Sequence, residues 1–323
     1  MPHGIFSVSL DFELYWGVRD KRSIEQYRCN LLGVRQAVPA MLGVFREHDV
    51  HATWATVGFL FFDSKESLLQ NLPPLLPGYA QSALSPYPYI QSSDCLEAAY
   101  HFAPDLLDMI AACAGQEIGT HTFSHYYCLE QGQTLEQFAA DISAAVATAR
   151  ARGLRMDSIV FPRNQWNPSY LATLNQLGIR CYRGNEQSWI YQASADAQET
   201  RLQRALRLLD AYLNLSGHNT YQLAECMREA PFNFPASRFL RPYSKQLARF
   251  EWLRLRRIKA AMNDAAINGK LFHLWWHPHN FGANTSQNIH FLTKIAEHYR
   301  DLNSRYGMRS LNMGEICRQG NIS

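Results

Sequence analysis

In GIFSVSLDFELYW, residues 4–16, a run of apolar and β-branched residues ends abruptly at two carboxylates, and this pattern indicates the class of fold. Residues 4–10 have the composition of a buried strand. Asp11 and Glu13 stand two positions apart at its end, so on a strand they face the same side. In parallel α/β folds the carboxyl ends of the strands meet on one face, where active sites are built. The sequence therefore predicts a first strand that delivers two carboxylates to such a face.

The rest of the chain alternates between strand-like and helix-like segments. Strands are expected where short apolar runs lie between turn signals, at residues 51–62, 117–121, 158–162, 179–182 and 271–277. Helices are expected where apolar residues recur at helical spacing, at residues 29–48, 104–114, 134–152, from 167 onward, 244–268 and 285–305. A short strand and helix close the chain. This alternation predicts a parallel sheet or barrel with helices outside.

Two segments interrupt the alternation and are expected to be insertions. Residues 63–104 have a cluster of five prolines near their middle, which breaks regular structure. Residues 185–243 form the second insertion, with one helix expected near 199–214. Because 323 residues lie within the range of a single α/β barrel, we expect one domain over residues 1–323.

Composition excludes several classes of protein. Hydrophobic residues make up 47% and charged residues 18% of the chain, which is typical of a packed globular protein and argues against disorder. The net charge of +3 and the isoelectric point near 8.4 are too weakly basic for a nucleic-acid-binding protein, and no zinc-finger motif is present. Because no apolar run reaches about 18 residues, no transmembrane helix is predicted.

The seven cysteines favour a reducing compartment. Their number is odd, they are scattered, and no Cys-x-x-Cys occurs, so we expect reduced thiols rather than a disulfide framework. The first residues, MPHGIFSVSLDFE, lack the basic region of a signal peptide, and Asp11 and Glu13 interrupt their apolar stretch. We therefore expect a cytoplasmic protein.

A second polar pair, His121 and His125 in GTHTFSH, follows another predicted strand. Histidines four apart can present two imidazoles to one divalent cation. The alternative is a pair of packed histidines, since His273 and His277 show the same spacing among 12 histidines. Two carboxylates and two histidines together form the ligand set of a catalytic zinc or similar ion that keeps a position open for water.

Two further strand ends carry polar side chains. Arg163 in FPRNQ follows a strand and a proline, and a guanidinium beside a catalytic carboxylate would hold it ionised and oriented. The alternative is an ordinary surface ion pair. His277 and His279 in WWHPHNF end an apolar strand, where a histidine can donate a proton to a departing amine. The alternative here is a pair of packed histidines.

The order of these motifs resembles that of the polysaccharide deacetylase family, the NodB-homology carbohydrate esterases. SLDFE resembles the first motif in its Asp-x-Asp/Glu form, THTFSH the histidine motif, FPRNQ the arginine motif and LWWHPHNF the last motif. HATWATVGF is similar to the signature of the family's second strand. The resemblance spans about residues 4–315, with the two insertions unmatched.

The resemblance implies a distorted (β/α)7-type barrel of the NodB-homology kind. It also implies a hydrolase that removes an N-acetyl or other N-acyl group from a sugar with the help of a divalent metal ion. Zinc is the expected metal, with cobalt, nickel and manganese as alternatives. The implied catalytic residues are Asp11 as base, His277 as acid and Arg163, and the implied metal ligands are Glu13, His121 and His125.

The sequence departs from the family pattern in two places. The adjacent Asp-Asp of the commonest version is replaced by Asp11-Phe12-Glu13, so the roles of the two carboxylates could be exchanged. The acidic fourth motif has no clear counterpart in RCYRGNEQSW, where Arg183 or Glu186 are the candidates to replace it. His277 is chosen over His279 as the acid because it stands directly at the strand end.

The substrate follows from the resemblance together with the expected compartment. An N-acylated sugar that is lipid-linked, nucleotide-linked or part of a glycan fits a cytoplasmic enzyme of surface polysaccharide biosynthesis, such as that of O-antigen and lipopolysaccharide. Aromatic rings suit the apolar faces of pyranose rings. The residues expected to contact the substrate are Trp16, Trp166, Asn164 and His279.

Residues 238–259 carry eight cations and one acid among apolar residues. Such a segment can contact an anionic membrane surface beside a lipid-linked substrate. A solvated outer helix of the barrel is the alternative, and the one that we favour.

Two other functions are compatible with the motifs. A deformylase or a hydrolase of non-sugar C–N bonds would show the same site residues on the same barrel. A non-catalytic carbohydrate-binding relative would be expected to have lost the base, the arginine or the terminal histidine, yet Asp11, Arg163 and His277 are all present.

Overall fold

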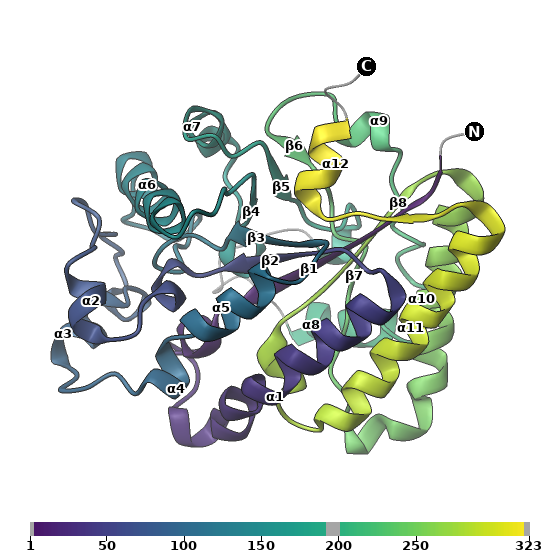
Figure 1. Ribbon diagram of the computed structural model, residues 1–323, viewed down its shortest axis with the longest axis horizontal. Coiled ribbons are helices and arrows are strands. Elements are labelled where there is room, and N and C mark those ends of the chain that lie inside the picture. Colours follow the sequence, from purple (N-terminus) through teal and green to yellow (C-terminus); the bar gives the residue numbers. More distant parts are fainter. Residues whose placement is uncertain (1–2, 192–200, 320–323) are drawn as a thin grey trace.

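A computed structural model describes residues 3–191 and 201–319 and shows one curled, parallel sheet surrounded by helices (Figure 1). The strands follow the order β6-β5-β4-β3-β2-β1-β8-β7, with β9 also paired to β1, and each of these pairings is parallel. The expected fold class, a distorted (β/α) barrel, is confirmed. The strands are β1 Ile5–Phe12, β2 Ala52–Thr56, β3 Gln116–Thr120, β4 Ser158–Val160, β5 Cys181–Arg183, β6 Phe232–Asn233, β7 Arg238–Phe239, β8 Leu271–Trp276 and β9 Arg309–Ser310.

Helices follow most of the strands and cover the outside of the sheet (Figure 1). The long helices α1, α10 and α11 lie along one side, and α11 packs against both of the others. The helices are α1 Ile24–His48, α2 Lys65–Leu69, α3 Tyr87–Ser92, α4 Ala98–His101, α5 Pro104–Ala111, α6 Leu135–Ala151, α7 Leu171–Gln176, α8 Arg201–Asp210, α9 Leu223–Cys226, α10 Glu251–Asn268, α11 Thr285–Tyr306 and α12 Met313–Gln319.

Capping residues fix the beginnings of two long helices. Ser23 and Gln26 form a reciprocal capping box at the start of α1, and Thr134 and Gln137 form another at the start of α6. In the described parts of the chain, no helix combines the length and the apolar character needed to cross a membrane.

Element boundaries differ from expectation where tertiary context overrides local pattern. The second strand ends at Thr56 because residues 58–61 turn into a 3-10 helix. The basic helix starts at Glu251, and residues 245–250 before it are a 3-10 helix. The two segments expected to be insertions carry short elements that local patterns did not predict: α2, α3 and α4 in residues 63–104, and α9, β6 and β7 in residues 185–243. β6 and β7 pair with β5 and β8, so the second segment contributes two strands to the central sheet. The expected start of a helix at 199 lies outside the described residues.

β1 is the centre of the fold. All eight of its residues are buried, and it pairs with β2 on one side and β8 on the other. Its Phe12 packs edge-on against Trp54, which in turn contacts Phe45 of α1. Each large apolar side chain that is fully buried contributes about 1.5–3 kcal/mol relative to exposure. The carboxyl end of the most buried strand is therefore held firmly in place.

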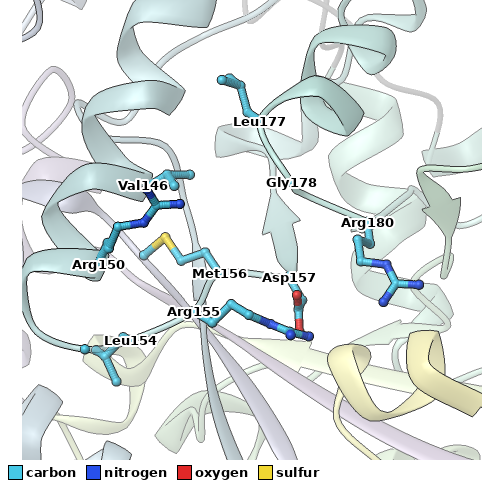
Figure 2. Close-up of a pocket in the computed structure, with 10 residues that line it drawn as sticks. Val146, Arg150, Leu154, Arg155, Met156, Asp157, Leu177, Gly178 and Arg180 are labelled. Carbon is cyan, nitrogen blue, oxygen red and sulfur yellow. The ribbon is translucent and has the colours of Figure 1, made fainter.

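The two ends of the sheet differ in chemistry. A hollow of about 520 Å³ lies at the amino end of β4, where Met156 and Asp157 line it together with Arg150 and Arg180 (Figure 2). The carbonyl oxygen of Val160, at the opposite end of β4, accepts a hydrogen bond from His121, one of the candidate site residues. The hollow is thus separate from the face where the strand ends converge.

The second insertion is tied down by a buried carboxylate, Asp210 of α8. Its oxygens accept hydrogen bonds from Ser216 N (2.8 Å), from the Tyr191 hydroxyl (2.9 Å) and from Arg238 Nη1 (3.0 Å), and Arg257 Nη2 lies 3.7 Å away. Burial alone would raise the pKa of Asp210, but the Arg238 guanidinium and the hydrogen bonds from Ser216 outweigh it and lower this pKa to about 2.

Replacing this carboxylate should destabilise the protein. We expect Asp210→Ala to lower the free energy of unfolding by about 3–5 kcal/mol, because Arg238 and Arg257 stay buried without their partner. Urea unfolding monitored by circular dichroism measures the change. The effect should shrink as the pH falls from 3.8 towards about 2, where the wild-type carboxyl also takes up a proton.

The control is Asp301→Ala, which removes an exposed ion pair with Arg305 and should change stability by about 0–1 kcal/mol. Equal effects of the Asp210 and Asp301 substitutions would show that the buried pair does not anchor the insertion.

Candidate active site

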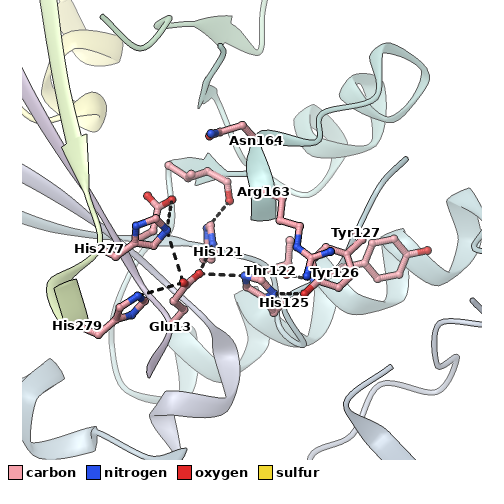
Figure 3. A network of polar contacts seen from close by, with 12 residues as sticks. Glu13, His121, Thr122, His125, Tyr126, Tyr127, Arg163, Asn164, His277 and His279 are labelled. Carbon is pink, nitrogen blue, oxygen red and sulfur yellow. Dashed lines mark hydrogen bonds and ion pairs between the residues drawn. The ribbon is translucent and has the colours of Figure 1, made fainter. Parts of the chain in front are cut away.

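The carboxyl ends of β1, β3 and β8 bring carboxylates and histidines together in one cluster (Figure 3). Asp11 lies within β1 and Glu13 directly follows it, while His121 follows β3 and His277 follows β8. His277 Nε2 lies 3.8 Å from Asp11 Oδ2 and 3.6 Å from Glu13 Oε1. His125, four residues after His121, reaches the same place. The convergence expected from the sequence is therefore present in the structure.

Glu13 sits between two imidazoles. Its Oε2 lies 3.2 Å from His121 Nε2 and 3.0 Å from His125 Nε2, and the three side chains are buried. One ligand atom from each lies within 4.8 Å of the others, so a single ion could contact all three. A Cβ on Gly17 would lie 2.0 Å from the Glu13 carboxyl carbon, so only glycine leaves room for this side chain.

The hydrogen bonds of His121 show which of its nitrogens faces the carboxylate. Nδ1 lies 2.8 Å from the carbonyl oxygen of Val160, to which it can only donate. In a neutral ring Nε2 then carries the lone pair and points at Glu13 Oε2. Two electron-rich atoms at this distance need a positive charge between them, either a proton or a metal ion. The donor set therefore fits a divalent cation.

The histidine loop has an unusual backbone that a buried carboxylate holds in place. Thr122 and His125 both have positive φ, 64° and 61°. Asp141 of α6 accepts hydrogen bonds from Phe123 N (2.7 Å), from Ser124 N (3.1 Å) and from the Ser124 hydroxyl. Non-glycine residues with positive φ persist where the surroundings enforce them, commonly at functional sites. No local pattern in the sequence indicates this role of Asp141.

Asp11 is held by Arg183 of β5 rather than by Arg163. Arg183 donates from Nη1 to Asp11 Oδ1 (2.7 Å) and from Nη2 to Oδ2 (2.8 Å), and its side chain is fully buried. It also donates to Ser9 Oγ and Asn164 Oδ1, both at 2.9 Å. Burial would raise the pKa of Asp11, but the Arg183 charge outweighs it and lowers this pKa. Asp11 is thus kept ionised and oriented.

Arg163 lies elsewhere in the same region, which corrects the position that we expected for it. Its guanidinium pairs with Asp20 and stacks over the ring of Tyr127, 4.3 Å from the centroid. The reason is the backbone: Arg163 and Asn164 both have positive φ, 54° and 53°, in a tight turn after β4. The sequence had pointed to Arg183 only as a candidate to replace the acidic fourth motif, not as the partner of Asp11.

His277 is oriented by two residues that the sequence analysis missed. Asn280 Nδ2 donates to His277 Nδ1 at 3.3 Å, and the Tyr27 hydroxyl of α1 donates to Asn280 Oδ1 at 2.9 Å. Since Nδ1 accepts, the neutral ring carries its hydrogen on Nε2, the atom that faces both carboxylates. The side chain of His277 is 23% exposed, whereas those of Asp11 and Glu13 are each 5% exposed. His277 therefore combines a donor nitrogen with access to solvent.

The four residues expected to contact substrate have different surroundings. Trp16 is buried, packs against Phe59 and donates from Nε1 to the His101 carbonyl oxygen, so it is a core residue and that expectation is wrong. Trp166 is partly buried against Tyr182. Asn164 is occupied at Oδ1 by Arg183.

His279, the fourth of these residues, lies against the cluster. It is buried with Nε2 3.9 Å from Glu13 Oε1, and its ring stacks on that of His277. Burial, with the nearby His277, lowers the pKa of His279 to about 3, so its imidazole is neutral. A neutral ring at this place can accept or donate a hydrogen bond without adding charge.

A curled parallel sheet with acid and histidine side chains at the carboxyl ends of its strands is the architecture of an α/β-barrel enzyme. Residues 32–182 match the family model for polysaccharide deacetylase. The family resemblance seen in the motifs is thus confirmed, and it supports a hydrolase that acts on amide bonds. The matched range contains His121, His125 and Arg163.

Solved structures with the same fold cover nearly the whole chain. A Mycobacterium smegmatis protein described as a polysaccharide deacetylase has a TM-score of 0.61 at 13% identity, covering 100% of this chain and 92% of its own. A Pseudomonas aeruginosa PAO1 protein described in the same way has a TM-score of 0.57 at 10% identity, covering 100% of this chain and 95% of its own. The PuuE allantoinase has a TM-score of 0.57 at 11% identity, covering 99% of this chain and 91% of its own. At these identities the likeness shows the fold alone. No curated protein sequence matches the chain.

The contact between Arg183 and Asp11 generates a direct comparison of two arginines. We expect Arg183→Met to lower kcat/KM for acetate release about 10²–10⁴-fold, the contribution of a positioned acid or base, because Asp11 loses its orientation. Arg183→Lys keeps the charge but loses the bidentate contact, so its kcat/KM should lie between those of wild type and Arg183→Met.

Arg163→Met is the matched variant, since it removes a guanidinium that pairs with Asp20 instead. Its effect should be smaller than that of Arg183→Met, with thermal unfolding confirming that both variants fold. A larger loss of kcat/KM in Arg163→Met than in Arg183→Met would show that Arg163, as first expected, is the arginine that orients the catalytic carboxylate.

Proposed function

We propose that the protein is a metal-dependent hydrolase that removes an N-acetyl, or other N-acyl, group from a sugar. One observation carries the proposal: Glu13, His121 and His125 offer three buried ligand atoms within 4.8 Å of one another, beside a carboxylate held by an arginine. The family match of residues 32–182 supports the reaction type.

Glu13, His121 and His125 would hold the metal ion. One oxygen and two nitrogen ligands, with a further position open, suit zinc best, and cobalt, nickel or manganese are alternatives. A divalent cation bound there would lower the pKa of a water molecule towards about 7 and polarise the amide carbonyl. The contacts favour Glu13 as the metal ligand and Asp11 as the base, because both oxygens of Asp11 already accept hydrogen bonds from Arg183.

Asp11 would act as the base and His277 as the acid. The Arg183 guanidinium keeps Asp11 ionised, so its carboxylate can accept the proton of the attacking water. In its protonated form His277 would pass the Nε2 proton to the departing amine nitrogen and return to the neutral ring, whose Nδ1 accepts from Asn280. Each positioned group contributes on the order of 10²–10⁴-fold in rate. Arg183, Asn280 and Tyr27 act by holding these two groups in orientation.

The substrate that we propose is an N-acylated sugar in surface polysaccharide biosynthesis, as a lipid-linked, nucleotide-linked or glycan form handled in the cytoplasm. The family description and the names of two structural neighbours support the sugar. Partly buried Trp166, and Trp189 with 63% of its surface exposed shortly after β5, supply rings for a pyranose face.

A hydrolase of non-sugar C–N bonds is the second candidate. The PuuE allantoinase, whose structure covers 99% of this chain at a TM-score of 0.57, favours it. A deformylase belongs to the same alternative. Assays that separate acetate, formate and ammonia distinguish these reactions, because the site residues would be the same.

Replacing His121 tests the proposed centre. Purified wild-type protein should hold about one divalent ion per chain and release acetate from N-acetylated sugar nucleotides or glycans. His121→Ala should lose the bound metal and the activity together, because a buried triangle of ligands is reduced to two. Elemental analysis by mass spectrometry and enzymatic acetate detection measure the two effects.

His298→Ala is the control, since His298 contacts Asn263 on the helical side and takes no part in the cluster. It should retain metal and activity. If His121→Ala retained the full metal content and the full activity, the proposed centre would be eliminated.

A further inference from the structure

Large apolar side chains are exposed where α8 and the loop after it face the start of α10. Leu209, Leu213 and Leu215 are each 49–50% exposed, and Trp252 in the first turn of α10 is 59% exposed. Exposed apolar groups that cluster in this way mark an interaction surface. We call these four residues, with the exposed cations Arg249 and Arg256, the α8–α10 patch.

The patch is continuous across the two elements. A hollow of about 300 Å³ lies between the loop and the helix, and Leu213 and Arg256 both line it. A second hollow, of about 420 Å³, is lined by Trp252 and again by Arg256. Since Arg256 borders both hollows, Leu213 and Trp252 flank one exposed guanidinium. Backbone hydrogen bonds from Leu213 N to Leu209 O and from Leu215 N to Leu213 O keep the three leucines within one short stretch of ordered backbone.

The patch is positive because Arg249 and Arg256 are exposed, whereas three other cations of residues 238–259 are buried beside carboxylates. Arg238 and Arg257 are buried against Asp210, and Arg254 is buried against Glu251. The sequence pattern allowed residues 238–259 to form one basic face, but the structure divides their cations between the interior and the surface. In the described structure no ion pair involves Arg249 or Arg256, so both can meet an external negative charge.

The patch lies at the same end of the sheet as the candidate site. Only Gly269 and Lys270 connect α10 to β8, so the helix runs back along the strand and its first turn lies near the carboxyl end of β8, which His277 follows. Contacts join the two places: Arg254 donates to the Arg241 carbonyl oxygen, the Arg241 guanidinium lies over Phe239, and the rings of Phe239 and His277 are 5.8 Å apart.

We propose that the α8–α10 patch docks onto the surface of an anionic lipid bilayer. A tryptophan and leucines beside arginines match the boundary between acyl chains and acidic headgroups. A second copy of this chain fits less well, because a two-fold contact of the patch with itself would bring the arginines of both copies together. Docking would place the mouth of the candidate site next to the membrane, where a lipid-linked substrate is presented. That consequence, though not the docking itself, rests on the proposed function.

Vesicle co-sedimentation with the full chain tests the docking. The protein should bind mixed phosphatidylcholine/phosphatidylglycerol vesicles, fail to bind phosphatidylcholine alone, and dissociate at high salt. Since each cation near an anionic surface strengthens binding about fivefold, the double variant Arg249→Gln/Arg256→Gln should bind about 25-fold more weakly. Trp252→Ala and Leu213→Asp should also weaken binding, which tests the apolar part separately.

Arg150→Gln and Leu75→Asp are matched controls, because both side chains are exposed away from the patch, and their binding should equal that of wild type. All variants should release acetate from a soluble N-acetylated sugar at the wild-type rate, so a failure of the proposed reaction would be visible independently. Equal binding to vesicles with and without anionic lipid would overturn the inference. Equal weakening of binding by the patch variants and the control variants would overturn it as well. So would a patch variant that changes the oligomeric state in size-exclusion chromatography.

Discussion

The candidate site depends on how the charges of two buried carboxylates at the end of β1 are balanced. Burying an ionised carboxylate costs several kcal/mol unless an opposite charge accompanies it. Asp11 has such a partner in the Arg183 guanidinium. Among the described residues, the Glu13 carboxylate pairs with imidazoles, those of His121, His125, His277 and His279. A divalent cation between Glu13 and the first two histidines would supply a positive charge there, and this is why we propose a metal centre at the cluster.

The surrounding structure holds this arrangement from several directions. Asp141 enforces the backbone of the histidine loop, and Gly17 leaves space for Glu13. Tyr27 and Asn280 set the tautomer of His277. Supporting residues of this kind come from α6, α1 and the turn after β8, so the precision of the site is a property of the whole half-barrel. A site built at the ends of buried strands gains rigidity from the packing below it.

Much of this could be predicted from the sequence, since the signals were local. The apolar run before Asp11, the spacing of His121 and His125, and the order of the motifs identified the fold and the residues that converge. Arg183 could not be placed, because its contact with Asp11 joins β5 to β1 across the sheet and no local pattern encodes that pairing. Trp16 was misjudged for a similar reason: only the packing with Phe59 and the contact with His101 show that its ring is enclosed.

Anomalous diffraction from crystals soaked with zinc would show whether Glu13, His121 and His125 share one ion. We expect a single strong peak in contact with Glu13 Oε2, His121 Nε2 and His125 Nε2, at about 2.0–2.2 Å from each. Asp11 would stay on Arg183 with its oxygens outside the coordination sphere. A peak bound through Asp11 with Glu13 turned away, or a cluster that stays empty while zinc binds at other histidines, would contradict the account.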